Sequence, residues 1–166
     1  MKVERVTGSP VSSIRTLYLN GLAEICFIDR LLILLQHLPN LHSLHIRTKE
    51  LTAPLTPAVQ CTSLLTILTL DTVSFSTPVI ASLTSALANL AALTIVCCQP
   101  IENVSFLDRQ QWLALIDRSP TLRELTIRFR RSNALDERTL QKAEQRLTRS
   151  IAGHDVTLRL IETHLK

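Results

Sequence analysis

The chain has 166 residues, of which 46% are hydrophobic and 19% are charged, and its net charge is +4. This length and composition exclude a disordered or linker-like chain and predict one domain with its own hydrophobic core. The longest apolar run, residues 31–35, is far shorter than the roughly 20 residues of a membrane-spanning helix, and no charged-then-apolar leader opens the chain, so we expect no membrane association and no secretory signal.

One phrase, (Ile/Leu)-x-x-Leu-x-(Ile/Leu), recurs along the chain and predicts its architecture. It occupies residues 14–19, 41–46, 65–70, 90–95 and 122–127, and a degraded copy lies at 158–160. The central leucines are therefore 27, 24, 25, 32 and 33 residues apart, at Leu17, Leu44, Leu68, Leu93, Leu125 and Leu158. Periods of roughly 20–50 residues are typical of solenoids, in which every repeat is one supersecondary unit.

Each repeat core alternates apolar and other residues, which predicts a strand with one buried face. Apolar residues at helical spacing predict helices between these strands, at 23–38, 77–88, 107–118 and 136–152. Thr77 and Pro78 are expected to cap and begin the second helix, and Gly153 to cap the end of the last. A short turn is expected around Thr56 and Pro57.

Strands that alternate with helices in this way form a parallel sheet with right-handed crossovers. In a doubly wound sheet both faces are covered and the strands are apolar throughout. Here the residue between the two buried strand positions is mostly polar, being Tyr18, His45, Thr69, Thr94 and Thr126 in turn. The sequence therefore predicts an α/β solenoid, with a curved parallel sheet of about six strands, helices on its convex side and one face open to water.

The chain resembles the leucine-rich repeat domains of fungal F-box-like proteins. The junctions Leu-Pro-Asn-Leu at 38–41 and Ser-Pro-Thr-Leu at 119–122, each between a helix and a strand, look like that group. The resemblance implies a single leucine-rich repeat domain at 14–166 behind an N-terminal extension at 1–13. It also implies that the concave sheet binds a protein, and that the domain is a substrate-recognition part of an F-box-type ubiquitin ligase.

The sequence differs from the pattern of that family in two features. Five residues after each central leucine the family has Asn or Cys, and here only Cys98 fits, so we expect irregular loops after the strands. The sequence contains no F-box, the helical segment that would dock on the ligase adaptor. The link to ubiquitination is therefore implied by the repeats alone.

Strand alternation assigns the side chains of the predicted open face. We expect protein-binding contacts from Tyr18, Asn20, Ser43, His45, Arg47, Thr69, Asp71, Thr94, Glu124, Thr126 and Arg128. Thr157, Arg159 and Ile161 of the sixth strand should lie on the same open face. Tyr18 is the expected interface anchor, whereas Trp112 falls on the apolar stripe of a helix and should belong to the core.

These residues do not have the pattern of a catalytic or metal site. Ser43 and His45 lie on one flat strand, with no elbow and no oxyanion donors, so a hydrolytic trio with Asp71 is not expected. His42 and His45 should point to opposite faces, and no third ligand follows either this pair or the adjacent cysteines. We therefore predict no enzymatic activity, no metal and no cofactor.

The four cysteines form no C-x-x-C pair, and we expect reduced thiols in a cytoplasmic or nuclear protein. The basic run at 128–131 suggests an alternative, a protein associated with nucleic acid, but 4% aromatic residues do not support base stacking. A second alternative is a scaffold that uses its helical outer face or its sheet edges.

The two ends of the predicted sheet differ. The helix at 136–152 has a charged outer stripe and is suited to a terminal element, whereas no amphipathic segment precedes the strand at 14–19. An open strand edge tends to recruit another chain. We therefore expect either self-association through the 14–19 edge, or a longer protein with an F-box-like segment upstream.

Overall fold

A computed structural model describes residues 2–4, 14–52, 61, 63–74, 76–102, 104–133 and 135–163, with the backbone alone at 2–4 and 22–24. Strands and helices alternate along most of this chain. The elements are β1 (Lys2–Glu4), β2 (Thr16–Phe27), α1 (Ile28–Gln36), β3 (Ser43–Thr52), β4 (Ile67–Ser74), α2 (Thr77–Ser85), β5 (Ala92–Ile101), the 3-10 turn η2 (Val104–Leu107), α3 (Arg109–Asp117), β6 (Glu124–Arg131), α4 (Glu137–Ile151) and β7 (Thr157–Glu162).

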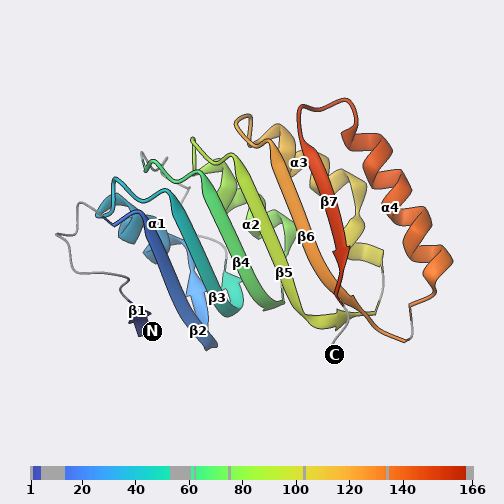
Figure 1. Ribbon diagram of the computed structural model, residues 1–166, viewed down its shortest axis with the longest axis horizontal. Coiled ribbons are helices and arrows are strands. Elements are labelled where there is room, and N and C mark those ends of the chain that lie inside the picture. Colours follow the sequence, from blue (N-terminus) through green and yellow to red (C-terminus); the bar gives the residue numbers. More distant parts are fainter. Residues whose placement is uncertain are drawn as a thin grey trace.

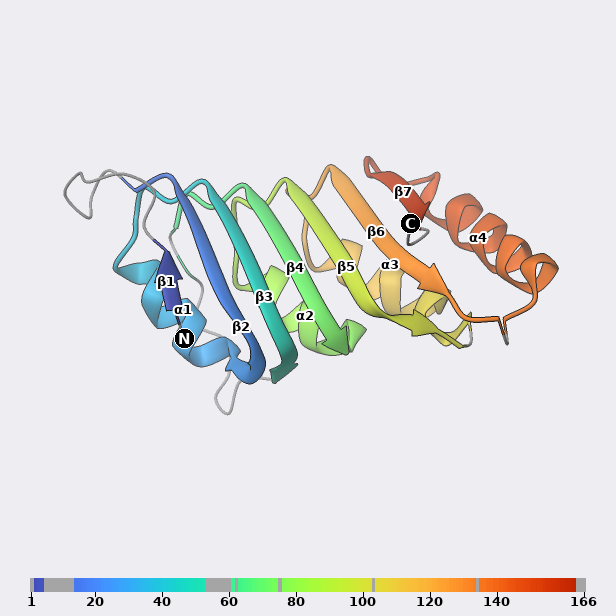
Figure 2. The same ribbon diagram turned by 60° about the horizontal axis from the view of Figure 1, so that its bottom comes forward.

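The strands form one seven-stranded sheet in chain order, β1 to β7. Strands β2 to β7 are parallel, whereas β1 is antiparallel to β2. Helices α1, α2 and α3 lie on one side of the sheet, and α4 lies at its C-terminal end (Figures 1 and 2). The predicted α/β fold with a parallel sheet and one open face is confirmed, with seven strands instead of about six.

Alternating burial along the strands separates the two faces of the sheet. In β4, Leu68 and Leu70 are completely buried, whereas Ile67 and Thr69 point to the other face. The central leucines are cross-strand partners throughout, and we call this set the leucine column: Leu17, Leu44, Leu68, Leu93, Leu125 and Leu158. Buried residues of the helices join the same continuous hydrophobic cluster.

Four successive strands begin with the same pair of backbone hydrogen bonds. One carbonyl just before a strand accepts from two consecutive N–H groups of the next repeat. The acceptors and their donors are Arg15 with His42 and Ser43, His42 with Thr66 and Ile67, Thr66 with Ala91 and Ala92, and Ala91 with Arg123 and Glu124. The repeated sequence phrase therefore has a repeated backbone geometry.

The first predicted helix is shorter than expected. Residues 23–27 continue strand β2, and Ile25, Cys26 and Phe27 pair with residues 50–52 of β3 after a register irregularity that begins at Gly21. The helix starts only at Ile28, and four residues of the predicted apolar stripe are buried on it: Ile28, Leu31, Leu32 and Leu35. The prediction failed at 23–27 because these residues suit a strand equally well and β3 is long enough to pair with them.

The other helices lie within the predicted ranges, but their caps differ. In α2 the N-cap is Ser76, so Thr77 is already the first helical residue. The last helix, α4, ends in Ala152, a right-handed C-cap whose N–H donates to the carbonyl of Thr148. The prediction of Gly153 as the cap is therefore wrong. The turn predicted at Thr56 and Pro57 lies outside the described residues.

Trp112 is fully buried, as predicted, and its indole N–H donates to the carbonyl of Phe106 at 2.6 Å. All four cysteines are free thiols. None of the described helices is long and apolar enough to cross a membrane.

The N-terminal edge of the sheet differs from the prediction. Strand β1, from within the expected extension, pairs antiparallel with residues 18–20 of β2, so the 14–19 edge is not left open there. Pairing by three residues at the start of a chain leaves no periodic pattern in the sequence. Beyond Asn20, the described residues contribute no strand to the outer edge of β2.

Candidate functional site

The six parallel strands present three cross-strand rows of side chains on the side without helices, and we call this surface the open face. The first row is Thr16, Ser43, Ile67, Ala92, Glu124 and Thr157; the middle row is Tyr18, His45, Thr69, Thr94, Thr126 and Arg159; the third is Asn20, Arg47, Asp71, Val96, Arg128 and Ile161. All of these residues are exposed or half-buried. The orientation predicted for the binding residues is confirmed, while their part in binding stays a prediction.

The middle row carries an aromatic pair at its N-terminal end. Tyr18 and His45 are cross-strand neighbours, with ring centroids 5.5 Å apart and ring planes at 39°. Tyr18 is nevertheless 47% exposed. Much of its surface can therefore contact another molecule while His45 restricts its motion.

The third row carries a charged cluster. Arg47 Nε lies 3.3 Å from Asp71 Oδ2, and the thiol of Cys98 donates a hydrogen bond to Asp71 Oδ1. Cys98 was not predicted as a site residue, although it follows Val96 by two residues and strand alternation places it on the same face. The three residues lie on adjacent strands, and the carboxylate of Asp71 contacts both Arg47 and Cys98.

The pKa values of Cys98 and of the neighbouring Cys97 are raised above that of a free thiol. Burial, the hydrogen bond to Asp71 and the charge of that carboxylate raise the pKa of Cys98 to about 11, although Arg47 acts in the opposite direction. Cys97 faces the core, where burial and the neighbouring Cys98 raise its pKa to about 12. Because the thiolate is the reactive form, we expect both thiols to react slowly with electrophiles at neutral pH.

Replacement of Asp71 by alanine should make Cys98 react faster with iodoacetamide at pH 8. The variant loses the carboxylate that raises the pKa of Cys98 and keeps Arg47, which lowers it. The pKa of Cys98 should therefore fall and come closer to the pH of the assay. Each pKa unit removed increases the thiolate fraction about tenfold at a pH below the pKa. Timed alkylation with peptide mass spectrometry measures the rate, with Cys26, whose pKa is raised by burial alone, as internal reference. An unchanged Cys98 rate would show that Asp71 does not control this thiol.

The residues considered for a hydrolytic trio do not form one. Asp71 is paired with Arg47 and bound by Cys98, while the cross-strand partner of His45 is Thr69. His42 lies outside the open face, with its Nδ1 2.7 Å from the carbonyl oxygen of Asn40. Among the described residues, no three His, Cys, Asp or Glu side chains are grouped so that they could hold a metal ion.

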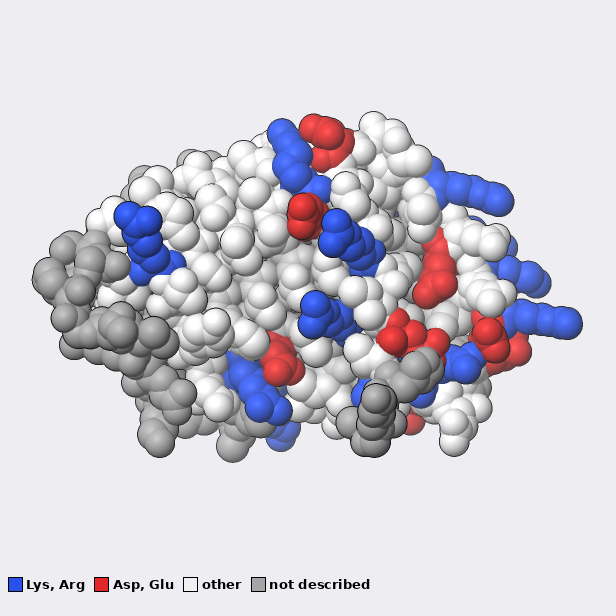
Figure 3. Space-filling view, in the orientation of Figure 1, with Lys and Arg blue, Asp and Glu red and all other residues white. Residues whose placement is uncertain are grey.

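The open face is a mixed surface without a dominant charge. Figure 3 shows this face from the front, with separate positive and negative side chains on a largely uncharged surface. Exposed aliphatic side chains contribute in the middle of the sheet, at Ile67 on β4, and at its C-terminal end, at Ile161 on β7. This composition is typical of surfaces that contact proteins, where apolar area and a few charged groups are combined.

The basic run at 128–131 does not form one patch. Arg128 lies on the open face, whereas Phe129 is buried in the core. Arg131 is half-buried between Glu137 and Glu162, with nitrogen–oxygen distances of 3.6 and 3.3 Å. Because successive side chains of a strand alternate in direction, Phe129 is directed into the core and interrupts the basic run.

Two buried threonines, which the sequence pattern did not predict as structural residues, bind backbone carbonyls near the C-terminal ends of β3 and β4. Thr48 Oγ1 donates to the carbonyl of Glu50 at 3.1 Å, and Thr72 Oγ1 lies 2.6 Å from the carbonyl oxygen of Ser74 and 3.3 Å from that of Lys49. Both lie four residues after a central leucine. This is one residue before the position at which leucine-rich repeat domains carry Asn or Cys. They satisfy backbone carbonyls at the strand ends, which is a structural role.

Comparisons of the chain with protein-family models, with curated proteins and with solved structures gave no match.

Proposed function

We propose that this protein is a non-enzymatic interaction module that binds another protein on its open face. The observation that carries the proposal is a surface of three side-chain rows on six adjacent strands, on which no described element packs. Six strands at a spacing of ~4.8 Å span on the order of 25 Å. That width suits an extended peptide or one face of a small domain.

The side chains on this face suit protein recognition better than catalysis. Tyr and Arg are enriched among residues that dominate binding energy, and here Tyr18 and Arg47 lie on adjacent strands. Strand pairing fixes the backbone beneath them, and His45 and Asp71 hold the two side chains from the side. An anchor held in place before binding loses less conformational freedom in the complex.

We further infer that the domain is a leucine-rich-repeat-type solenoid whose curved sheet carries its helices on the convex side. The in-register leucine column and the repeated backbone hydrogen bonds support this inference. By the resemblance of its repeats, the domain would serve as a substrate-recognition part of an F-box-type ubiquitin ligase in the cytoplasm or nucleus. The expected ligase link would be visible as co-purification of ligase subunits with the bound protein.

Site-specific photo-crosslinking tests the proposed binding face. A diazirine amino acid at Thr69 or Thr94, in the centre of the middle row, should give a covalent adduct with a partner protein in extracts of the source cells. The same group at Gln36 or Gln111, which are exposed on α1 and α3, should give no such adduct. Adducts from the helical positions alone would contradict the proposal.

A scaffold function is a second candidate, favoured by an apolar surface near the N-terminal edge. Ile25, Phe27 and Ile33 are exposed around a groove of about 460 Å³ between the end of β2 and α1. Since the outer edge of β2 has no described partner after Asn20, a second copy of the chain would cover both features. A diazirine at Ile33 that yields a homodimer adduct would support this candidate.

A further inference from the structure

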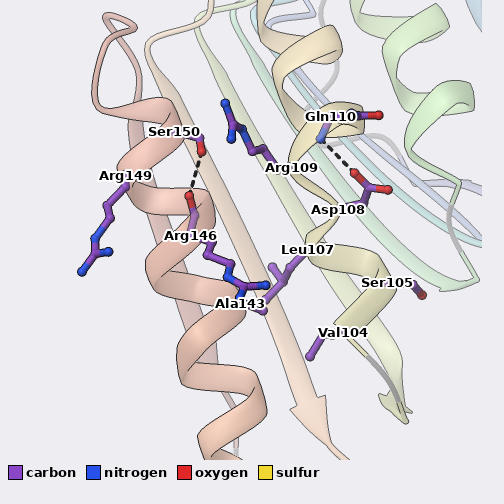
Figure 4. A pocket seen from close by; sticks show the side chains of 10 residues that line it. All are labelled: Val104, Ser105, Leu107, Asp108, Arg109, Gln110, Ala143, Arg146, Arg149 and Ser150. Atoms are coloured by element: carbon purple, nitrogen blue, oxygen red, sulfur yellow. Dashed lines mark hydrogen bonds between the residues drawn. The ribbon is translucent and has the colours of Figure 1, made fainter.

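A groove of about 760 Å³ separates α4 from the η2–α3 segment, on the side of the molecule opposite the open face (Figure 4). Its apolar part is formed by Val104, Leu107 and Ala143. Arg109 and Arg146 point into the gap between the two helices, whereas Arg149 points away from it (Figure 4). Two segments far apart in the chain thus combine guanidinium groups with an aliphatic floor.

The arginines of the groove have no counter-charge among the residues that the structure describes. Arg109 and Arg146 are exposed, and neither forms an ion pair with a described residue. Among the described residues that line the groove, Asp108 alone carries a carboxylate, which accepts the N–H of Gln110 at 2.8 Å and caps α3. The groove therefore carries a local excess of positive charge that an anionic ligand would balance.

The basic side chains of α4 lie apart from its acidic ones, so positive charge continues along the helix beside the groove. Arg138, Lys142, Arg146 and Arg149 recur at helical spacing on one stripe. The acidic side chains lie on a different stripe, where Glu137 is paired with Arg131. Figure 3 shows Lys and Arg side chains projecting at this end of the molecule. An elongated ligand with several negative charges would fit this arrangement better than a single small anion.

The floor of the groove distinguishes between two classes of polyanion. Its lining contains no aromatic ring, so it offers no platform on which a nucleic-acid base could stack. Val104 and Ala143 are half-buried and leave aliphatic surface that water solvates poorly. A peptide that carries both carboxylates and aliphatic side chains matches the walls and the floor together.

We propose that this groove binds an acidic segment of a partner protein, in which carboxylates alternate with aliphatic side chains. The carboxylates pair with Arg109 and Arg146, since guanidinium and carboxylate groups form charge-assisted hydrogen bonds of matching geometry. The aliphatic side chains pack on Val104, Leu107 and Ala143. This surface is independent of the open face and lets one chain hold two partners, or two parts of one partner, on opposite sides.

Fluorescence anisotropy with the labelled peptide Gly-Glu-Leu-Asp-Glu-Leu-Asp-Glu-Leu-Gly tests the proposal. The wild-type protein should bind it, and the Arg109→Gln/Arg146→Gln variant should bind at least about tenfold more weakly. The matched control, Arg15→Gln/Arg30→Gln, removes the same charge from exposed residues outside both the groove and the open face and should keep the wild-type affinity within about twofold. Circular dichroism establishes that both variants are folded, which the exposure of all four arginines leads us to expect.

Three outcomes would overturn the proposal. The first is an equal loss in both double variants, which would show that net charge alone attracts the peptide. The second is equal affinity for a peptide with serine in place of leucine, because the apolar floor would then play no part. The third is displacement of the peptide by an equal concentration of single-stranded oligothymidylate, which would assign the groove to nucleic acid. The open face can still be the site of protein binding after any of these results.

Discussion

Replacement of Leu68 by alanine is expected to lower the free energy of unfolding by about 2–5 kcal/mol. Leu68 is completely buried in the middle of the leucine column, with Leu44 and Leu93 as its cross-strand neighbours. Strand pairing fixes both neighbours, so the surrounding residues can fill the resulting cavity only in part. Urea denaturation followed by circular dichroism measures the change, with the slope of the transition as a check on two-state behaviour.

The control for this experiment lies one residue away on the same strand. Thr69 points to the open face and is half-buried, so Thr69→Ala should change the free energy of unfolding by less than about 1 kcal/mol. The comparison isolates the effect of the face on which the side chain lies, because the two substitutions affect neighbouring residues of one strand and introduce the same residue. Equal losses would mean that both faces of β4 are packed, which contradicts the open face.

The alternation of residues within each repeat was sufficient to predict the two faces of the sheet. Every residue expected on the open face is exposed or half-buried there, and the first five central leucines are buried on the other face. This succeeds because a strand has a period of two and its register is fixed by burial of one face. The sixth copy, around Leu158, has lost part of the phrase, and that leucine is only partly buried.

Features that depend on pairing between distant residues could not be predicted. Residues 25–27 read as the start of a helix until their partners at 50–52 are known. The short strand β1 joins the sheet through backbone groups, which every sequence possesses. Local apolar spacing therefore placed the first helix but not its beginning.

The candidate sites differ in how far the sequence specifies them. The open face follows from alternation, and the same rule applied for one more step includes Cys98 beside Asp71. The groove between η2–α3 and α4 arises only when two helices pack, so Arg109 and Arg146 are brought together by tertiary structure alone. In the basic run at 128–131, by contrast, residues that are neighbours in the sequence are divided between the core and the surface.

Truncation of Tyr18 or Arg47 to alanine is expected to weaken partner binding by about 1–3 kcal/mol each, which corresponds to roughly 5- to 150-fold in Kd. Tyr18 offers an exposed ring held by His45, and Arg47 offers a guanidinium group held by Asp71. Both side chains are largely outside the core, and an exposed ion pair contributes about 0–1 kcal/mol to stability. The loss should therefore be in binding, with the free energy of unfolding nearly unchanged.

Isothermal titration of the partner captured by photo-crosslinking tests the proposed role of the open face most directly. Four proteins are compared: wild type, Tyr18→Ala, Arg47→Ala and the outer-face control Gln36→Ala/Gln111→Ala. We predict that both open-face variants bind about 5- to 150-fold more weakly while the control stays within about twofold of wild type. Wild-type affinity in both open-face variants, together with weakened binding in the control, would place the binding site on the helical side and contradict the proposed function.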